Sequence, residues 1–366
     1  MYLTLYAVLL IVSFITSAVL TIVVKNLAVR FDFVSRPSAD RFNRSVIPLG
    51  GGIAIYTTIV AALAFAVFVV YFLIEPGRLD KVLGETVVIH AVGFIEKIPR
   101  LLVVIFCITA LFALGLVDDK YHLGPFKKLF FQFVIAFIAA AFADVRAEFF
   151  IHSRKITALL STFWIVLIIN AFNFLDNMDG ASAGIAIITS AILFVAAAMS
   201  GQIFVCSMAL IFIGSLLGFL VFNFPPAIIF MGDAGSLVVG FIVALLTLRT
   251  TYYYQLVDDN WYSIFMPFIV MAVPLYDFIS VSMLRISQGK SPFVGDTQHF
   301  SHRLKRRGLT ETQTVLTLYL ATLVTGLGAT FLYQVNLAGA VLIFIQTFLI
   351  LAIIAIMEGA SLKNDI

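Results

Sequence analysis

The sequence predicts an all-α, polytopic integral membrane protein that forms a single transmembrane domain over residues 1–366. Three observations favour this class. Hydrophobic residues make up 62% of the chain, and charged residues make up 12%, which is half of the ~25% usual in soluble domains. The mean hydropathy is +1.09. Apolar runs long enough to cross a bilayer also recur along the whole chain.

A transmembrane helix needs roughly 20 mostly apolar residues, and about eleven runs approach this length. The first run lacks a charged leading segment, so we expect a retained helix and not a cleaved signal peptide. The expected spans, of which the fourth and eighth are the shortest, are Tyr2–Val24, Leu49–Ile74, Leu101–Val117, Leu129–Ala143, Ile156–Phe172, Ala181–Ser200, Ile203–Phe222, Leu237–Leu248, Ser263–Leu284, Thr314–Tyr333 and Leu337–Met357.

Alternation of these spans divides the connecting loops into two sets, one on each side of the membrane. Fifteen of the 23 Lys and Arg residues lie in one set, and the positive-inside rule places that set in the cytoplasm. The expected protein is therefore a multi-pass protein of the inner (cytoplasmic) membrane, with its N-terminus outside and its C-terminus inside. The basic set comprises the C-terminal tail and loops 25–48, 118–128, 173–180, 223–236 and 285–313.

Charge and cysteine content exclude several other classes. A formal net charge of +3 without a basic tail gives no reason to expect a nucleic-acid partner. Cys107 and Cys206 both lie within apolar runs, where a free thiol behaves as a small hydrophobe. They provide no disulfide framework and no Cys-x-x-Cys metal pattern. We therefore expect the partners in the membrane and at its surface.

The loop after the first span carries Arg41 and Arg44, and the segment Pro48-Leu-Gly-Gly-Gly52 opens the second span. Glycine lets backbone N–H groups approach an anion, and arginine suits phosphate, so Arg44 is a candidate substrate-binding residue. An ordinary basic loop with a glycine hinge explains the same pattern equally well.

Two adjacent carboxylates, Asp118 and Asp119, follow the third span. Because they repel each other, either one of them has a raised pKa or both share a cation, and either case suits a base or a metal site. Lys128 and Gln132 follow at a spacing of four and share a helix face. The alternative is a solvated turn whose charge is balanced by lysines.

A polar segment, Asn170-Ala-Phe-Asn-Phe-Leu-Asp-Asn-Met-Asp-Gly180, interrupts two long apolar runs. If Trp164–Asn177 is helical, four of its polar side chains lie on one face. Unpartnered polar groups are costly in hydrocarbon, so this face must meet water, a cation or a ligand. A capped turn between two helices, with Asp179 as N-cap, is the alternative. The face consists of Asn170, Asn173, Asp176 and Asn177.

The loop after the seventh span runs from Asn223 to Ser236, and glycines flank its Asp233 just before a helix. Helix N-termini attract anions, so this Asp is either the cap itself or a cation ligand that brings a phosphate to the helix. Phe230 is a candidate for stacking on a base, although packing is the commoner role of such an aromatic residue.

The last basic loop contains Asp296-Thr-Gln-His299-Phe-Ser-His302-Arg303. Two imidazoles and a guanidinium can bind a phosphate. Across all loops of the basic set, the acidic groups favour a hard cation such as Mg²⁺ held together with substrate phosphates. This pattern indicates phosphoryl chemistry at the cytoplasmic membrane surface. Asp277, inside the ninth span, ranks lower as a functional candidate.

Together these segments resemble the polyprenyl-phosphate N-acetylhexosamine-1-phosphate transferases, the glycosyltransferase family 4 superfamily. That family moves an amino-sugar 1-phosphate from a UDP-sugar to a lipid phosphate and releases UMP. Ser301 departs from the His-x-His-His-Arg loop usual in the UDP-GlcNAc branch, although the following Arg303-Leu304 still favours that branch. The matching words are Asp118-Asp119 with Lys128-x-x-x-Gln132, Asn170-x-x-Asn173-x-x-Asp176-x-x-Asp179-Gly180, Phe230-Met-Gly-Asp233-Ala-Gly-Ser236 and Asp296-Thr-Gln-His299-x-x-His302-Arg303-Leu304.

The resemblance implies a Mg²⁺-dependent enzyme, with Mn²⁺ as a candidate substitute, acting in the first membrane step of cell-envelope polysaccharide synthesis. The implied partners are a UDP-amino sugar and a polyprenyl phosphate, and a homodimer is one candidate assembly. The implied roles are catalysis for Asp118, Asp119 and Asp176; metal binding for Asp233 and Asn173; uridine binding for Asn223, Asp179 and Phe230; sugar-phosphate binding for His299, His302 and Arg303; and substrate binding for Lys128 and Arg44.

Two other functions remain open at this point. The first is transfer of phospho-MurNAc-pentapeptide, a reaction of the same superfamily. The second is a secondary transporter, because broken helices with Asp and Asn also form ion sites. Against the transporter, the polar residues gather at one face and no inverted repeat is visible. A non-enzymatic scaffold explains the composition but not the ordered motifs.

Overall fold

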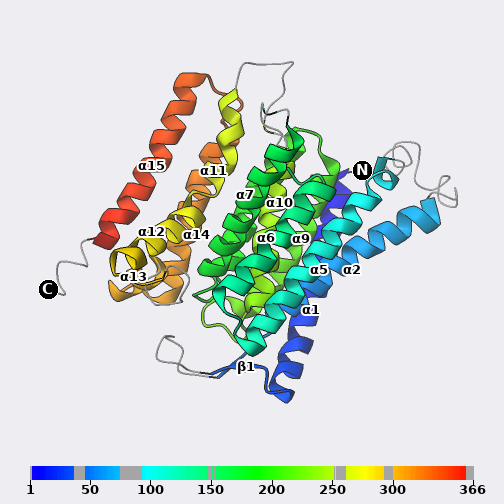
Figure 1. Cartoon of the computed structure of the whole chain (residues 1–366), viewed down its shortest axis with the longest axis horizontal. Coiled ribbons are helices and arrows are strands. Elements are labelled where there is room, and N and C mark those ends of the chain that lie inside the picture. Colours follow the sequence, from blue (N-terminus) through cyan, green and yellow to red (C-terminus); the bar gives the residue numbers. More distant parts are fainter. Residues whose placement is uncertain are drawn as a thin grey trace.

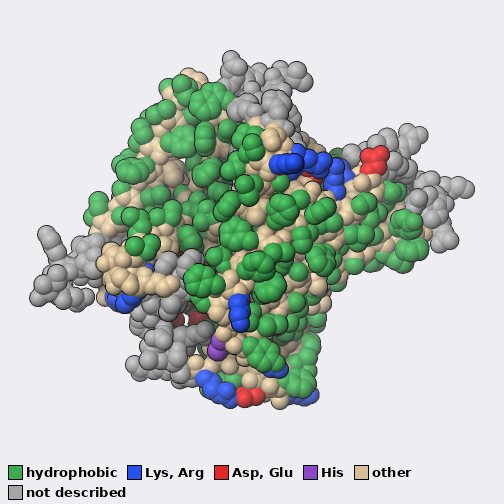
Figure 2. All heavy atoms as spheres, viewed as in Figure 1, with side chains coloured by type: hydrophobic (Ala, Val, Ile, Leu, Met, Phe, Trp, Pro, Cys, Tyr) green, Lys and Arg blue, Asp and Glu red, His purple; other side chains and the backbone are tan. Residues whose placement is uncertain are grey.

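The computed structural model describes residues 2–36, 46–74, 93–146, 151, 153–250, 252, 261–291 and 300–359. It confirms the predicted all-α architecture, with long helices packed side by side in one bundle (Figure 1). In the described ranges, the only strands are β1 (Val34–Ser35) and β2 (Ile47–Pro48), an antiparallel pair between the first two helices. Apolar side chains cover the middle of the face drawn in Figure 2, and basic side chains lie toward its two ends.

The apolar runs fold into helices close to the predicted bounds. The helices are α1 (Tyr2–Arg30), α2 (Gly51–Val69) with a π-helical extension (Val70–Ile74), α5 (Ile98–Tyr121), α6 (Pro125–Phe142), α7 (Arg154–Leu175), α8 (Ala181–Met199), α9 (Ile203–Asn223), α10 (Asp233–Arg249), α11 (Met266–Val270), α12 (Ala272–Ser287), α13 (Phe300–Arg306), α14 (Glu311–Thr330) and α15 (Leu337–Gly359).

Ten of the eleven predicted membrane spans have a counterpart that passes the test of length and hydropathy among the described residues. Nine helices of the described residues are long and apolar enough to cross a membrane, and one bent pair brings the number to ten. The remaining predicted span, Leu237–Leu248, lies within α10, which has 17 residues. Every residue of α10 from Ala234 to Thr247 is buried. This helix is therefore surrounded by protein rather than by lipid.

The ninth predicted span is not continuous, which corrects the expectation of one helix over Ser263–Leu284. A short 3₁₀ helix (Trp261–Phe265) and α11 precede α12, and the two parts are bent by 62°. Pro274 explains the break because it has no N–H to donate to the carbonyl group of Val270. The bend leads α12 toward α13 at one side of the bundle (Figure 1).

Glycines let the backbones of three helices meet at one point. A Cβ atom at Gly115 of α5 would lie 2.4 Å from the Ala234 backbone, and one at Gly52 of α2 would lie 2.2 Å from the Gly235 backbone. Larger residues do not fit there. The N–H groups of Gly51 and Gly52 donate to the carbonyl groups of Phe230 and Met231, both at 2.9 Å. These two N–H groups are thus not available to bind an anion, which was the role that the glycine-rich segment suggested.

Candidate active site

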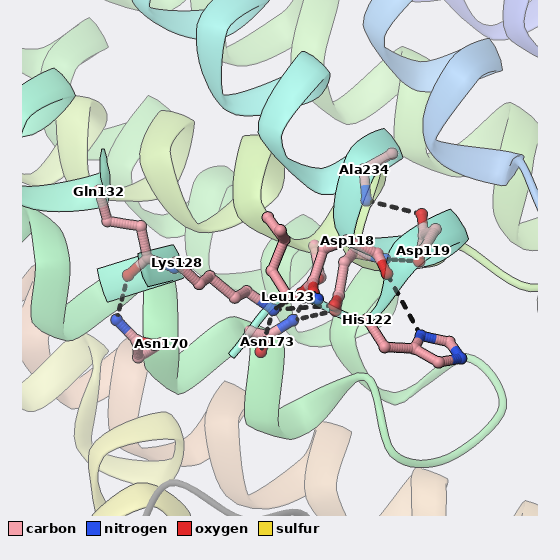
Figure 3. A network of polar contacts seen from close by, with 11 residues as sticks. Asp118, Asp119, His122, Leu123, Lys128, Gln132, Asn170, Asn173 and Ala234 are labelled. Atoms are coloured by element: carbon pink, nitrogen blue, oxygen red, sulfur yellow. Dashed lines mark hydrogen bonds and ion pairs between the residues drawn. The ribbon is translucent and has the colours of Figure 1, made fainter. Parts of the chain in front are cut away.

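The ammonium group of Lys128 lies at the centre of a cluster of oxygen atoms (Figure 3). Its Nζ lies 2.8 Å from Asp118 Oδ2 of α5 and 2.8 Å from Asp233 Oδ2 of α10. Asn173 Oδ1 of α7 lies 3.4 Å away. Lys128 itself lies in the first turns of α6 and its side chain is 13% exposed. Such a cation needs carboxylate partners, because burial of an unpaired charge is costly.

Asp118 and Asp119 are adjacent but face different partners. Oδ1 of Asp118 accepts the N–H of Leu123 at 2.7 Å, just after α5 ends. The carboxylate of Asp119 accepts the N–H groups of Asp233 at 2.8 Å and Ala234 at 3.1 Å. Successive residues of a helix point about 100° apart, which allows this division. Of the two carboxylates, Asp118 alone forms an ion pair with Lys128.

The polar face of α7 meets this cluster as the helical spacing predicted. Nδ2 of Asn173 donates to Asp233 Oδ1 at 2.6 Å and to Ser236 Oγ at 2.8 Å. One turn earlier, Nδ2 of Asn170 donates to Gln132 Oε1 at 2.7 Å. The shared face predicted for Lys128 and Gln132 therefore packs against the shared face of Asn170 and Asn173.

The residues after α7 connect loops that are far apart in the sequence. Asp176 is half-buried at the C-cap of α7. The Asp179 carboxylate accepts the N–H of Ala227 at 2.8 Å, while the N-cap of α8 is Gly180. Asp179 is thus not the cap considered above. Burial raises the pKa of the Asp179 carboxyl, and the hydrogen bond from Ala227 partly offsets this rise.

Asn223 and Phe230 are held by backbone contacts. Oδ1 of Asn223 accepts the N–H of Gly180 at 3.0 Å, and its Nδ2 donates to the Ile229 carbonyl at 3.0 Å. The N–H of Phe230 donates to the Pro48 carbonyl at 2.9 Å, and its ring is half-buried. Asn223 therefore joins two loops. Both polar atoms of its side chain already have a backbone partner, so its uridine-binding role stays a prediction.

The last basic loop contributes α13, which contacts α12 and the segment that follows α7. Ser301 donates to Asn177 Oδ1 at 2.6 Å, and Nη2 of Arg303 donates to Ser280 Oγ at 2.8 Å. His302 lies in α13, but its side chain is outside the described part of the chain. His299 and Arg44 lie entirely outside the described residues, so their proposed roles stay predictions.

One buried cation was not selected from the sequence. Arg285 is 1% exposed near the end of α12, and its guanidinium carbon lies 5.2 Å from the centroid of the Phe174 ring. A single arginine in the last turn of an apolar helix usually indicates the membrane boundary, which is why its burial was not foreseen. Asp277 of the same helix is also buried, at 1% exposed.

The donor set around Lys128 fits a hard cation. Its oxygen atoms come from two carboxylates and one amide, and they already surround a positive charge. Among the described residues, no group of three or more His, Cys, Asp or Glu could hold a metal ion. A metal here would therefore need oxygen atoms from a substrate, which is typical of Mg²⁺ in phosphate-binding sites. Dependence on Mg²⁺ stays a prediction.

Comparisons with known proteins place this cluster in context. A family model described as glycosyl transferase family 4 matches residues 101–251, a range that contains all the residues around Lys128. A Bacillus subtilis (strain 168) protein named probable undecaprenyl-phosphate N-acetylglucosaminyl 1-phosphate transferase is 29% identical, over 97% of this chain and 92% of its own. Proteins named undecaprenyl-phosphate alpha-N-acetylglucosaminyl 1-phosphate transferase are similar too, in Yersinia pestis (24%, over 94% and 87%) and Salmonella typhi (25%, over 89% and 83%). The resemblance predicted from the motifs is confirmed.

Proposed function

We propose that this chain, which a glycosyl transferase family 4 model matches over residues 101–251, transfers N-acetylglucosamine-1-phosphate from UDP-GlcNAc to a polyprenyl phosphate. The names of its relatives support a phosphoglycosyltransferase that acts on undecaprenyl phosphate. UDP-GlcNAc as donor and UMP as the released product are the finer parts of the proposal. The reaction would take place on the cytoplasmic side, where the basic loops are expected.

The observation that carries the proposal is the convergence of Asp118, Lys128 and Asp233 from three helices of the bundle. Phosphoryl transfer between two anionic substrates depends mainly on positioning and on stabilisation of negative charge. A buried ammonium among carboxylates can supply positive charge to a phosphate without recruiting it from solvent. A transporter does not require this arrangement at one end of the bundle.

The proposed roles follow from the geometry. In the net reaction, an oxygen of the lipid phosphate bonds to the β-phosphorus of the donor, and the bond from that phosphorus to the bridging oxygen breaks. Asp118 would take up any proton on the lipid phosphate and fix its orientation. Lys128 would donate to phosphate oxygens. Asp233 and Asn173 would hold Mg²⁺, which when bound neutralises pyrophosphate charge.

The test is UMP release by the purified protein with undecaprenyl phosphate and Mg²⁺. Three donors are compared: UDP-GlcNAc, UDP-GalNAc and UDP-MurNAc-pentapeptide. We expect release with UDP-GlcNAc and none from the Asp118→Asn variant. Preference for UDP-MurNAc-pentapeptide would move the protein to the other branch of the superfamily. No UMP from any donor, together with solute uptake into proteoliposomes, would support a transporter instead.

A further inference from the structure

Asp119 makes a contact that the adjacent Asp118 does not make. Its two carboxylate oxygens accept the N–H groups of Asp233 and Ala234, at 2.8 and 3.1 Å. These are the first two residues of α10, whose N–H groups have no partner within the helix. The negative charge also interacts favourably with the positive end of the helix dipole. Asp119 therefore caps α10 from a different helix (Figure 3).

Gly232 provides the space for this cap. It occupies the N-cap position of α10, where Ser, Thr, Asp or Asn would normally supply the capping oxygen. Its φ is +73°, in the region that favours glycine, and an added Cβ atom would lie 2.7 Å from Asp119 Oδ2. A side chain at this position would therefore displace the carboxylate. The local sequence leaves out its own cap, and Asp119 supplies one.

The cap fixes a second carboxylate. Asp233 is the first residue of α10, so the N–H group held by Asp119 lies on the residue whose carboxylate contacts Lys128 and Asn173. Small shifts of this helix end would move the Asp233 oxygens away from Lys128. By contrast, both oxygens of Asp119 are already occupied by backbone donors of α10.

We propose that Asp119 is a positioning residue, which caps α10 and so holds the Asp233 carboxylate where a divalent cation is bound. The cation part rests on the proposed function, whereas the cap does not. The adjacent carboxylates thus have separate tasks. Asp118 faces the cation position, and Asp119 acts on it only through Asp233. Loss of such an indirect contact typically weakens metal binding by ~10- to 100-fold.

The test compares Asp119→Asn with wild-type protein in two measurements that need no substrate. Asn keeps one acceptor but turns its NH₂ group toward the second backbone N–H. Hydrogen–deuterium exchange should become about 5- to 30-fold faster at the start of α10, as expected for a lost cap. The Mn²⁺ dissociation constant, measured by electron paramagnetic resonance, should rise by ~10-fold or more. Lys120→Gln is the matched control, since Lys120 is exposed on the same helix turn.

A second variant tests the same contact from the other side. Gly232→Ala should reproduce both effects. The double variant should bind Mn²⁺ no more weakly than the weaker-binding single variant, because both changes remove the same contact. Unchanged exchange at α10 overturns the cap. Equal Mn²⁺ affinity of wild-type and Asp119→Asn protein, including no binding by either, overturns the positioning role. Neither the exchange measurement nor the Mn²⁺ affinity depends on UMP release. Failure of the proposed reaction can therefore be distinguished from failure of this proposal.

Discussion

The ammonium group of Lys128 lies 2.8 Å from Asp233 Oδ2, although 105 residues separate the two in the chain. Asp118 Oδ2 lies at the same distance on the other side. One positive charge thus holds together α5, α6 and α10 where they meet. The chain places its own cation at the position where we expect the metal, so we expect the stability of the protein to depend on divalent cations.

We therefore predict that Lys128→Met destabilises the protein more in the absence of divalent cations than in their presence. Removal of one partner from a buried ion pair costs ~3–5 kcal/mol, because the remaining charges have no counter-ion. Thermal unfolding in detergent, with EDTA or with Mg²⁺, measures the effect. Lys127→Met is the control, because Lys127 is exposed one residue earlier in the same helix. Equal losses in both variants would contradict the role of Lys128.

We predict that Asp118→Asn lowers kcat for UMP release by ~10²- to 10⁴-fold, the range for loss of a general base. The amide keeps an oxygen that can accept the Leu123 N–H, but it cannot take up a proton or neutralise Lys128. Excess Mg²⁺ should not restore turnover. A variant with normal kcat would remove the assignment of the base.

Ser301 should matter for substrate binding more than for turnover. Its hydroxyl donates to Asn177 and so fixes α13 beside the end of α7. A typical hydrogen bond contributes ~0.5–1.5 kcal/mol, so Ser301→Ala should raise the KM for the UDP-sugar by ~2- to 12-fold. Ser287→Ala is a matched control, since that hydroxyl donates to the Leu284 carbonyl of its own helix on the exposed surface. Equal KM values in the two variants would argue against this role.

At the other end of the bundle, Asp144 should make stability depend on pH. Burial alone would raise the pKa of its carboxyl, but hydrogen bonding and charge from Arg146, with Arg100 and Arg249 nearby, lower it below the ordinary value. A lowered pKa contributes stability that is present above the unfolded value of ~3.9 and is lost as the pH falls through the folded value.

Asp144→Asn should consequently cost ~1–3 kcal/mol near neutral pH. The difference from wild type should shrink below about pH 4. Unfolding temperatures of both proteins in detergent across this range measure the effect. A difference that stays constant with pH would show that the carboxylate charge is not the cause.

The sequence was sufficient for the architecture because each span is a long apolar run, whose helical structure follows from the cost of unpaired backbone groups in lipid. It did not reveal the break before α12, although Pro274 was its available signal. Four of the candidate site residues, Asp118, Lys128, Asn173 and Asp233, meet in space, and their roles stay predictions.

The separate contacts of Asp118 and Asp119 could not be foreseen. They depend on where the first turn of α10 meets α5, and no local pattern encodes that meeting point. Asp179 and Asn223 show the opposite difficulty. The family resemblance implied that they bind uridine, and in the structure both also hold backbone groups of neighbouring loops. A sequence shows that a polar group needs a partner, but it does not say whether that partner is protein or substrate.

The burial of α10 from Ala234 to Thr247 also constrains how the protein is made. Its main neighbours α2, α5, α7 and α8 all precede it in the chain, so they leave the ribosome first. Until α10 follows, Lys128 has only one of its two carboxylate partners. A nascent chain arrested before residue 233 would hold an unfinished bundle, which quality-control proteases could recognise. The cluster around Lys128 is therefore complete only when α10 has been inserted.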